Sequence, residues 1–138
     1  MTDKDFKIRC ELAALYRILH MYGMTDLANQ CAGARSIENK DNSYVHPYGM
    51  FYEEITASSL VKINKEGKAI ENDNPWLNDG CNNLAKWIFN ARDDVNFYVH
   101  GHANDVMAVG GTKEGLMYLS QAAVYLNHLI GYVDYEFV

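Results

Sequence analysis

The chain is organised around one run, Val95-Asn96-Phe97-Tyr98-Val99-His100-Gly101-His102. The run begins with apolar, β-branched and aromatic residues over the length of a strand, and it ends in two histidines separated by one glycine. Because successive side chains of a strand point to opposite faces, His100 and His102 are expected on one face, roughly 6–7 Å apart along the strand. Two imidazoles so placed can bind one metal ion. The alternative is an ordinary strand end whose histidines bond to water or to neighbouring carbonyl groups.

Length and composition predict one globular domain over residues 1–138. Hydrophobic residues make up 49% of the 138 residues and charged residues 22%, which is ordinary for a folded domain. The formal net charge of −6 argues against a nucleic-acid partner, because such proteins usually carry a basic surface. We find neither an apolar run of membrane-spanning length nor a signal peptide, so the sequence predicts a cytoplasmic protein with no membrane partner. The three cysteines imply no disulfide framework.

Hydrophobic periodicity predicts helices that alternate with short strands. Helices are expected over Phe6–Tyr22, Gly80–Ala91, Ala103–Val109 and Leu116–Leu129. Strands are expected over Cys31–Arg35, Tyr44–His46, Leu60–Asn64, Val95–His100 and Ile130–Phe137, with a hairpin turn at Lys65–Gly67 and a helical turn within Glu53–Ser59. We expect Leu60–Asn64 and Val95–His100 to be neighbours in the sheet of a layered α/β domain. The chain stops on a predicted strand without a terminal helix, which predicts a C-terminally shortened domain.

Four segments, in this order and spacing, resemble the class II aldolase/adducin family. They are His46–Gly49 with Tyr52–Ile63, Ala91–Asn96 leading to Val99–His102, Lys113–Leu116, and Tyr132–Tyr135. The resemblance covers nearly the whole chain, from Leu12 to Glu136. It implies a three-layer α/β/α fold around a central, largely antiparallel sheet. The segment Glu54–Lys62 resembles the adducin-like branch more than the sugar-phosphate aldolases, although the basic tail of adducin has no counterpart here and no cytoskeletal role is inferred.

The resemblance also implies a metal. Active members of the family hold a divalent ion, usually zinc, with three histidines, and the ion stabilises an enediolate as a C–C bond breaks or forms. The first two family histidines fall on His100 and His102. The third family histidine lies in a segment beyond this chain, and His128 lies in a helical pattern unlike that segment.

Several family positions hold different residues here. The catalytic glutamate of the aldolases, a general acid/base, is replaced by Cys81. Their phosphate-binding Gly-Asn-x-Ser stretch aligns with Gln30–Gly33, which includes Cys31, and their Ser/Thr-Gly pair appears as Tyr48-Gly49. These departures argue against cleavage of a sugar phosphate.

Each candidate residue also has an ordinary structural explanation. Near a helix start, Cys81 could be a nucleophile or a soft metal ligand, or simply a small buried filler, and the same choice applies to Cys31. His46, just before a turn, could line the pocket together with Tyr48 and Gly49, or be an ordinary hydrogen-bonded histidine.

Two functions therefore follow from the sequence. The first is a diverged metal-assisted lyase, of aldolase or decarboxylase type, acting on a small carbonyl or sugar-derived compound in carbohydrate metabolism. The second is a catalytically silent domain of the same fold that serves assembly or partner binding. Because apolar sheet edges tend to be paired or covered, we also expect a homo-oligomer.

Overall fold

A computed structural model describes residues 3–71 and 75–134 of the chain. Its elements divide into two compact units, residues 1–101 and 102–138, and each unit is described by itself. The first unit contains α1 (Asp3–Met21), β1 (Cys31–Arg35), β2 (Ser43–Val45), the 3₁₀ helix η1 (Tyr52–Glu54), β3 (Val61–Ile63), α2 (Asp79–Ala91) and β4 (Phe97–His100). The second contains α3 (Asn104–Gly110), α4 (Gln121–Leu126) and the 3₁₀ helix η2 (Asn127–Leu129).

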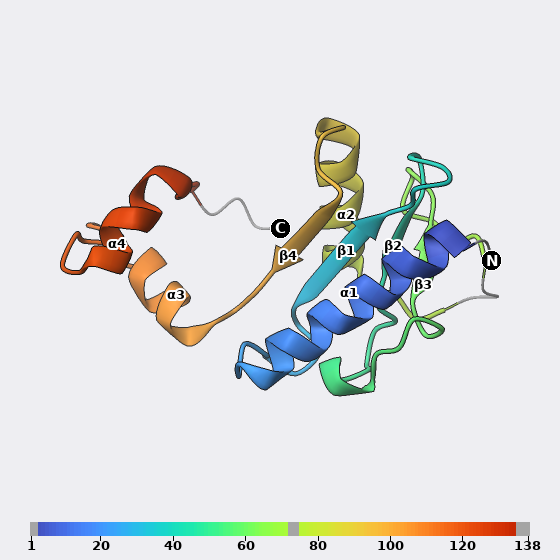
Figure 1. Cartoon of the computed structure of the whole chain (residues 1–138), viewed down its shortest axis with the longest axis horizontal. Coiled ribbons are helices and arrows are strands. Elements are labelled where there is room, and N and C mark those ends of the chain that lie inside the picture. The colour runs from blue at the N-terminus through green and yellow to red at the C-terminus, as the bar shows by residue number, and fades with distance from the viewer. Residues whose placement is uncertain (1–2, 72–74, 135–138) are drawn as a thin grey trace. The chain divides into compact units, whose positions relative to one another are not determined.

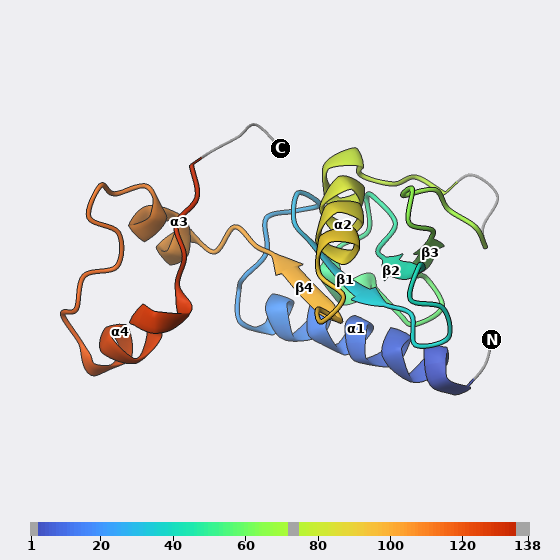
Figure 2. The same cartoon turned by 90° about the horizontal axis from the view of Figure 1, so that it is seen from above.

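The first unit is a three-layer α/β/α structure. Its four strands pair antiparallel in the order β3-β2-β1-β4. Helix α1 lies along one face of this sheet and α2 lies on the other (Figures 1 and 2). The predicted fold class, an α/β/α domain around an antiparallel sheet, is confirmed.

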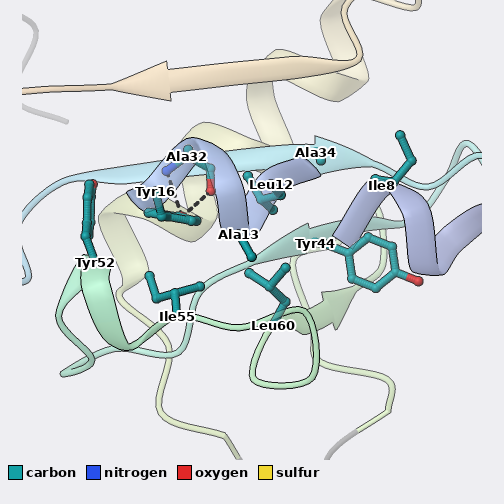
Figure 3. Close-up of a cluster of buried hydrophobic side chains, with 10 residues drawn as sticks. All are labelled: Ile8, Leu12, Ala13, Tyr16, Ala32, Ala34, Tyr44, Tyr52, Ile55 and Leu60. Carbon is teal, nitrogen blue, oxygen red and sulfur yellow. Dashed lines mark hydrogen bonds between the residues drawn. The ribbon is translucent and has the colours of Figure 1, made fainter. Parts of the chain in front are cut away.

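Alternation along the strands divides the core into two clusters, one on each face of the sheet. Ala32, Ala34 and Tyr44 pack against α1 and η1, as the close-up in Figure 3 shows. Their neighbours Cys31 and Val45 point the other way, into the cluster with α2. The two helices predicted most strongly, Phe6–Tyr22 and Gly80–Ala91, are confirmed as α1 and α2, each starting slightly earlier than predicted.

The prediction that Leu60–Asn64 and Val95–His100 are adjacent strands of the sheet is wrong. These segments are β3 and β4, and they form opposite edges of the sheet with β2 and β1 between them. Every residue of β1 and β2 is buried, so neither strand shows the alternation of polar and apolar residues that marks a half-exposed strand. Their central position could therefore not be read from the sequence pattern.

Two predictions in the C-terminal segment also need correction. Residues 116–120 are not helical, because the Ser120 hydroxyl accepts a hydrogen bond from Ala123 N at 3.1 Å and caps α4, which runs only over Gln121–Leu126. Within the described residues, 130–134 do not form a strand, and the remainder of the predicted strand Ile130–Phe137 lies outside them.

Gly33 lies in close contact with the Tyr98 ring of the neighbouring strand β4. It pairs across the sheet with Tyr98, and a Cβ atom at this position would collide with the Tyr98 ring. That ring packs edge-on against Phe89 of α2, with centroids 5.5 Å apart. The absence of a side chain at Gly33 therefore lets Tyr98 reach the interior under α2.

Replacing Gly33 by Ala is expected to lower the free energy of unfolding by about 2 kcal/mol, because the Tyr98 ring must leave its place against Phe89. Urea unfolding followed by far-ultraviolet circular dichroism measures the change. Gly101→Ala is the matched control, since the nearest atom to a Cβ there lies at 3.8 Å. A Gly33→Ala variant as stable as this control would show that the close contact does not constrain the sheet.

Candidate active site

The organising run becomes the edge strand β4. Its residues pair antiparallel with β1, so that His100 lies directly opposite Cys31 and Tyr98 lies opposite Gly33. Directly paired residues project from the same face of a sheet. His100, Tyr98 and Cys31 therefore share the face that α2 covers, and the first family histidine lies at the end of a strand next to Cys31.

Cys81 reaches the same place from the first turn of α2. This turn is fixed by the Asn78 side chain, whose Oδ1 accepts hydrogen bonds from Gly80 N at 2.9 Å and Cys81 N at 3.3 Å. Cys31 is fully buried and Cys81 is 6% exposed, within one apolar cluster. The Tyr98 hydroxyl donates to the Cys81 carbonyl oxygen at 3.0 Å and lies 3.8 Å from Cys31 Sγ.

The two thiols shift each other's pKa in opposite directions. The hydrogen bond between the side chains, together with burial, raises the pKa of Cys31. The same hydrogen bond lowers the pKa of Cys81 against the opposing effect of burial. The thiolate is therefore favoured at Cys81 rather than at Cys31.

His46 is held in the interior on the other side of the sheet. It is 3% exposed, and its Nδ1 lies 2.9 Å from the Tyr16 hydroxyl oxygen. That hydroxyl donates its only proton to Ala32 O at 2.5 Å and accepts from Ala32 N at 2.8 Å (Figure 3). The His46 Nδ1–H must then be the donor to Tyr16.

This arrangement makes His46 a neutral imidazole. Burial lowers the pKa of His46 from its ordinary value of 6.5 to about 4. Its Nε2 and the hydroxyl of nearby Tyr52 have no hydrogen-bond partner in the parts of the chain that the structure describes. The ring of His46 packs edge-on with Tyr16 and Tyr52, at centroid distances of 5.1 and 6.0 Å. The side chain acts as part of the core.

The predicted turn at Tyr48-Gly49 lies next to the segment that leads into α2. Tyr48 N donates to Trp76 O at 2.8 Å, which ties the two loops together. Gly49 has a φ of +92°, in the left-handed region that favours glycine. The Tyr48 side chain is 41% exposed, so it is accessible to a ligand, whereas Cys31 and His46 are enclosed.

The second predicted metal ligand, His102, is the first residue of the second unit. Over residues 3–71 and 75–134, no group of three His, Cys, Asp or Glu side chains is placed to hold a metal ion. His128 lies in η2 and is exposed. Two imidazoles are a donor set suited to zinc, but a zinc site needs at least one more protein ligand. The roles assigned to His100, His102, Cys81, Cys31, His46, Tyr48 and Gly49 remain predictions.

The sequence interpretation missed the part played by Tyr98. It lies two residues before His100 and so shares its face, and this spacing is visible in the sequence. What the spacing could not show is the contact with both cysteines, because that depends on the pairing of β1 with β4 and on the position of α2.

The sequence and the fold both match known proteins. The family model described as "Class II Aldolase and Adducin N-terminal domain" matches residues 10–137. The chain is 34% identical to a "Putative aldolase class 2 protein" of Caulobacter vibrioides, over 99% of this chain and 53% of that protein. It is 35% identical to alpha-adducin of Rattus norvegicus, over 97% of this chain and 18% of that protein.

A solved structure agrees with these relatives. The aldolase II superfamily protein from Pseudomonas syringae matches with a TM-score of 0.87 and 27% identity, covering 92% of this chain and 51% of that one. The chain thus spans about half the length of the bacterial relatives it matches. No helix in the described ranges is long and apolar enough to cross a membrane. Since the family model covers nearly all of its residues, the chain belongs to the class II aldolase and adducin family.

Proposed function

We propose that the chain is the domain of a diverged, metal-assisted carbon–carbon lyase, with His100 and His102 as ligands of a divalent ion, most simply zinc. The observation that carries this proposal is the His-Gly-His sequence at the end of β4, in the position of the first two metal histidines of the family. The proposed substrate is a small carbonyl or sugar-derived compound. The net charge of −6 continues to argue against a nucleic-acid ligand.

In this proposal, residues of the chain hold the metal ion at the end of β4. When bound, the metal would act as a Lewis acid on the carbonyl oxygen of the substrate. The pairing of His100 with Cys31 fixes the backbone of the first ligand in the sheet. The third ligand is proposed to come from Cys81, from another subunit or from a segment outside the described residues.

The remaining predicted residues take supporting roles in this proposal. Cys81 occupies the position of the family's general acid/base, and its lowered pKa favours the thiolate that could accept a proton. The exposed Tyr48 ring and the Gly49 turn are proposed to contact substrate directly. Cys31 and His46 are buried on opposite faces of the sheet, so their proposed contribution to substrate binding is indirect, through the packing of the strands that carry the site.

The alternative function is a catalytically silent domain used for assembly. Two observations favour it: the replacement of the family's glutamate by Cys81, and the 35% identity to rat alpha-adducin. The two functions make different predictions for turnover. The enzyme has a turnover that requires His100 and His102, and the silent domain has none.

Assembly into a homo-oligomer is part of either proposal. In the second unit, large apolar side chains are exposed, among them Leu119 at 81% and Leu129 at 71%. A cavity of about 520 Å³ in this unit is lined mainly by apolar residues, including Val106, Ile130 and Tyr132. Light scattering at micromolar concentration is expected to give a mass of at least two chains, and a monomer would contradict this expectation.

Turnover of non-phosphorylated hydroxycarbonyl compounds and β-keto acids tests the function. We expect carbon–carbon cleavage that a chelator abolishes and zinc restores. The His100→Ala/His102→Ala variant should be inactive, and Cys81→Ser should fall about 100-fold, as for loss of a general acid/base. His128→Ala, an exposed histidine, is the matched control and should keep full activity. If zinc-loaded wild type cleaves none of these compounds, the silent-domain alternative replaces the enzyme.

A further inference from the structure

Two cysteines far apart in the sequence meet beneath the start of α2. Cys31 is the first residue of β1, and Cys81 lies in the first turn of α2. The Tyr98 hydroxyl connects the same two residues, at 3.0 Å from Cys81 O and 3.8 Å from Cys31 Sγ. The two cysteines thus lie together in a cluster that is otherwise mostly apolar.

We propose that Cys31 and Cys81 form a redox-active dithiol that closes to a disulfide when the protein meets a hydroperoxide. The enclosure of the pair supports this assignment, because a sulfenic acid formed on one sulfur would face the other thiol rather than water. This proposal concerns the cysteines alone and does not depend on the proposed lyase activity.

The chemistry occurs in two balanced steps. Cys81, the less deeply buried of the two residues, attacks one peroxide oxygen; the O–O bond breaks, Cys81 becomes a sulfenic acid, and the other oxygen leaves as water. Cys31 then attacks the Cys81 sulfur, the S–O bond breaks, and the hydroxyl group leaves with the Cys31 proton as a second water. In total, two thiols lose two electrons and two protons, and hydrogen peroxide is reduced to two waters.

The positions of the two cysteines give them different roles in the proposed oxidation. Cys31 is held in the sheet by pairing with His100 and is fully buried, so a peroxide reaches it poorly. Cys81 lies at a helix end, where small backbone movements can bring its Cβ into the distance range of a disulfide. The exposed third cysteine, Cys10, lies on α1 and belongs to neither cluster.

The test uses hydrogen peroxide and intact-mass spectrometry under non-reducing conditions. In a Cys10→Ser background, which removes the exposed thiol, a stoichiometric dose is expected to remove two hydrogen atoms from the mass of the chain. Proteolysis should then yield one peptide pair that joins Cys31 to Cys81, and dithiothreitol should restore both thiols. Finding both thiols free after treatment, or Cys81 oxidised to a sulfinic acid while Cys31 stays free, would overturn the proposal.

Single variants assign the order of events. Cys31→Ser leaves Cys81 without its partner, so its sulfenic acid should persist and be trapped by dimedone, whereas Cys81→Ser should give little adduct at the buried Cys31. Equal labelling of both variants would contradict the assigned roles. Circular dichroism before treatment shows whether each variant is folded, and the disulfide in the protein with both cysteines remains the primary result. None of these measurements uses metal or turnover, so a failed lyase assay leaves this test intact.

Discussion

Replacing Asp5 by Ala is expected to lower the free energy of unfolding by about 3–5 kcal/mol, as for removal of one partner of a buried ion pair. The Asp5 side chain is 1% exposed, within the first turns of α1. It accepts hydrogen bonds from the Ser36 and Tyr44 hydroxyls, both at 2.8 Å, and from Ile37 N at 3.0 Å. Lys62 Nζ of β3 lies 3.5 Å away. The variant leaves the Ser36 and Tyr44 hydroxyls and Ile37 N without this acceptor, whereas Lys62 keeps its ion pair with Glu71 at 3.2 Å. Urea unfolding measures the loss.

The matched control on the same helix is Glu11→Ala. Glu11 pairs with Lys7 at 3.8 Å, but both side chains are largely exposed, so its loss should change stability by about 0.5 kcal/mol or less. Comparable losses for Asp5→Ala and Glu11→Ala would show that the Asp5 network does not hold α1 to the sheet.

The Asp5 network also predicts acid sensitivity. Burial raises the pKa of Asp5, but the hydrogen bonds from Ser36, Tyr44 and two backbone amides outweigh it, and the net pKa is lowered. A carboxyl with a lowered pKa in the folded state stabilises the protein above about pH 4, and this stability is lost as the pH falls through the folded-state pKa.

Stability is expected to fall by about 3 kcal/mol between about pH 6.5 and about pH 4 because of His46 alone. Burial lowers the pKa of His46 from 6.5 to about 4. In this interval the unfolded chain takes up a proton at His46 that the folded chain does not, so protonation favours the unfolded state. The direction follows from linkage: stability rises with pH wherever the unfolded state binds more protons.

His46→Asn tests this prediction, because an amide can keep the donation to the Tyr16 hydroxyl without titrating. The free energy of unfolding of this variant should be nearly flat in pH over the same interval. His20→Asn, at an exposed histidine next to Glu53, is the control and should keep the wild-type slope. If His46→Asn keeps the full slope, the buried imidazole is not its source.

The sequence predicted the elements of the first unit better than their arrangement. Helices α1 and α2 carry apolar stripes between clear ends, and β4 is a β-branched and aromatic run, so local patterns were sufficient. The order of the strands depends on β1 and β2, which are buried on both faces and carry no alternation. In the second unit, the spacing of Leu119, Ala122 and Leu126 suggested a long helix, but the cap at Ser120 delays its start.

The candidate site could be predicted only where its residues are close in the sequence. His100 and His102 are separated by one residue, and the family resemblance marks them as candidate metal ligands, a role that stays a prediction. The contact of Cys31 with Cys81 needs the register of β1 with β4 and the packing of α2, which are tertiary properties. His46 was placed near a turn correctly, but its burial depends on Tyr16 and Tyr52 from other segments.

The most direct test of the proposed metal centre is the zinc content of the chain, prepared without an affinity tag, equilibrated with zinc and then desalted. Elemental analysis is expected to find bound zinc in the wild type and in His128→Ala, and little in His100→Ala/His102→Ala. A lower zinc content in Cys81→Ser would identify the thiol as a third ligand. Zinc content that is equal in the wild type and the double histidine variant, or absent from both, would contradict the account.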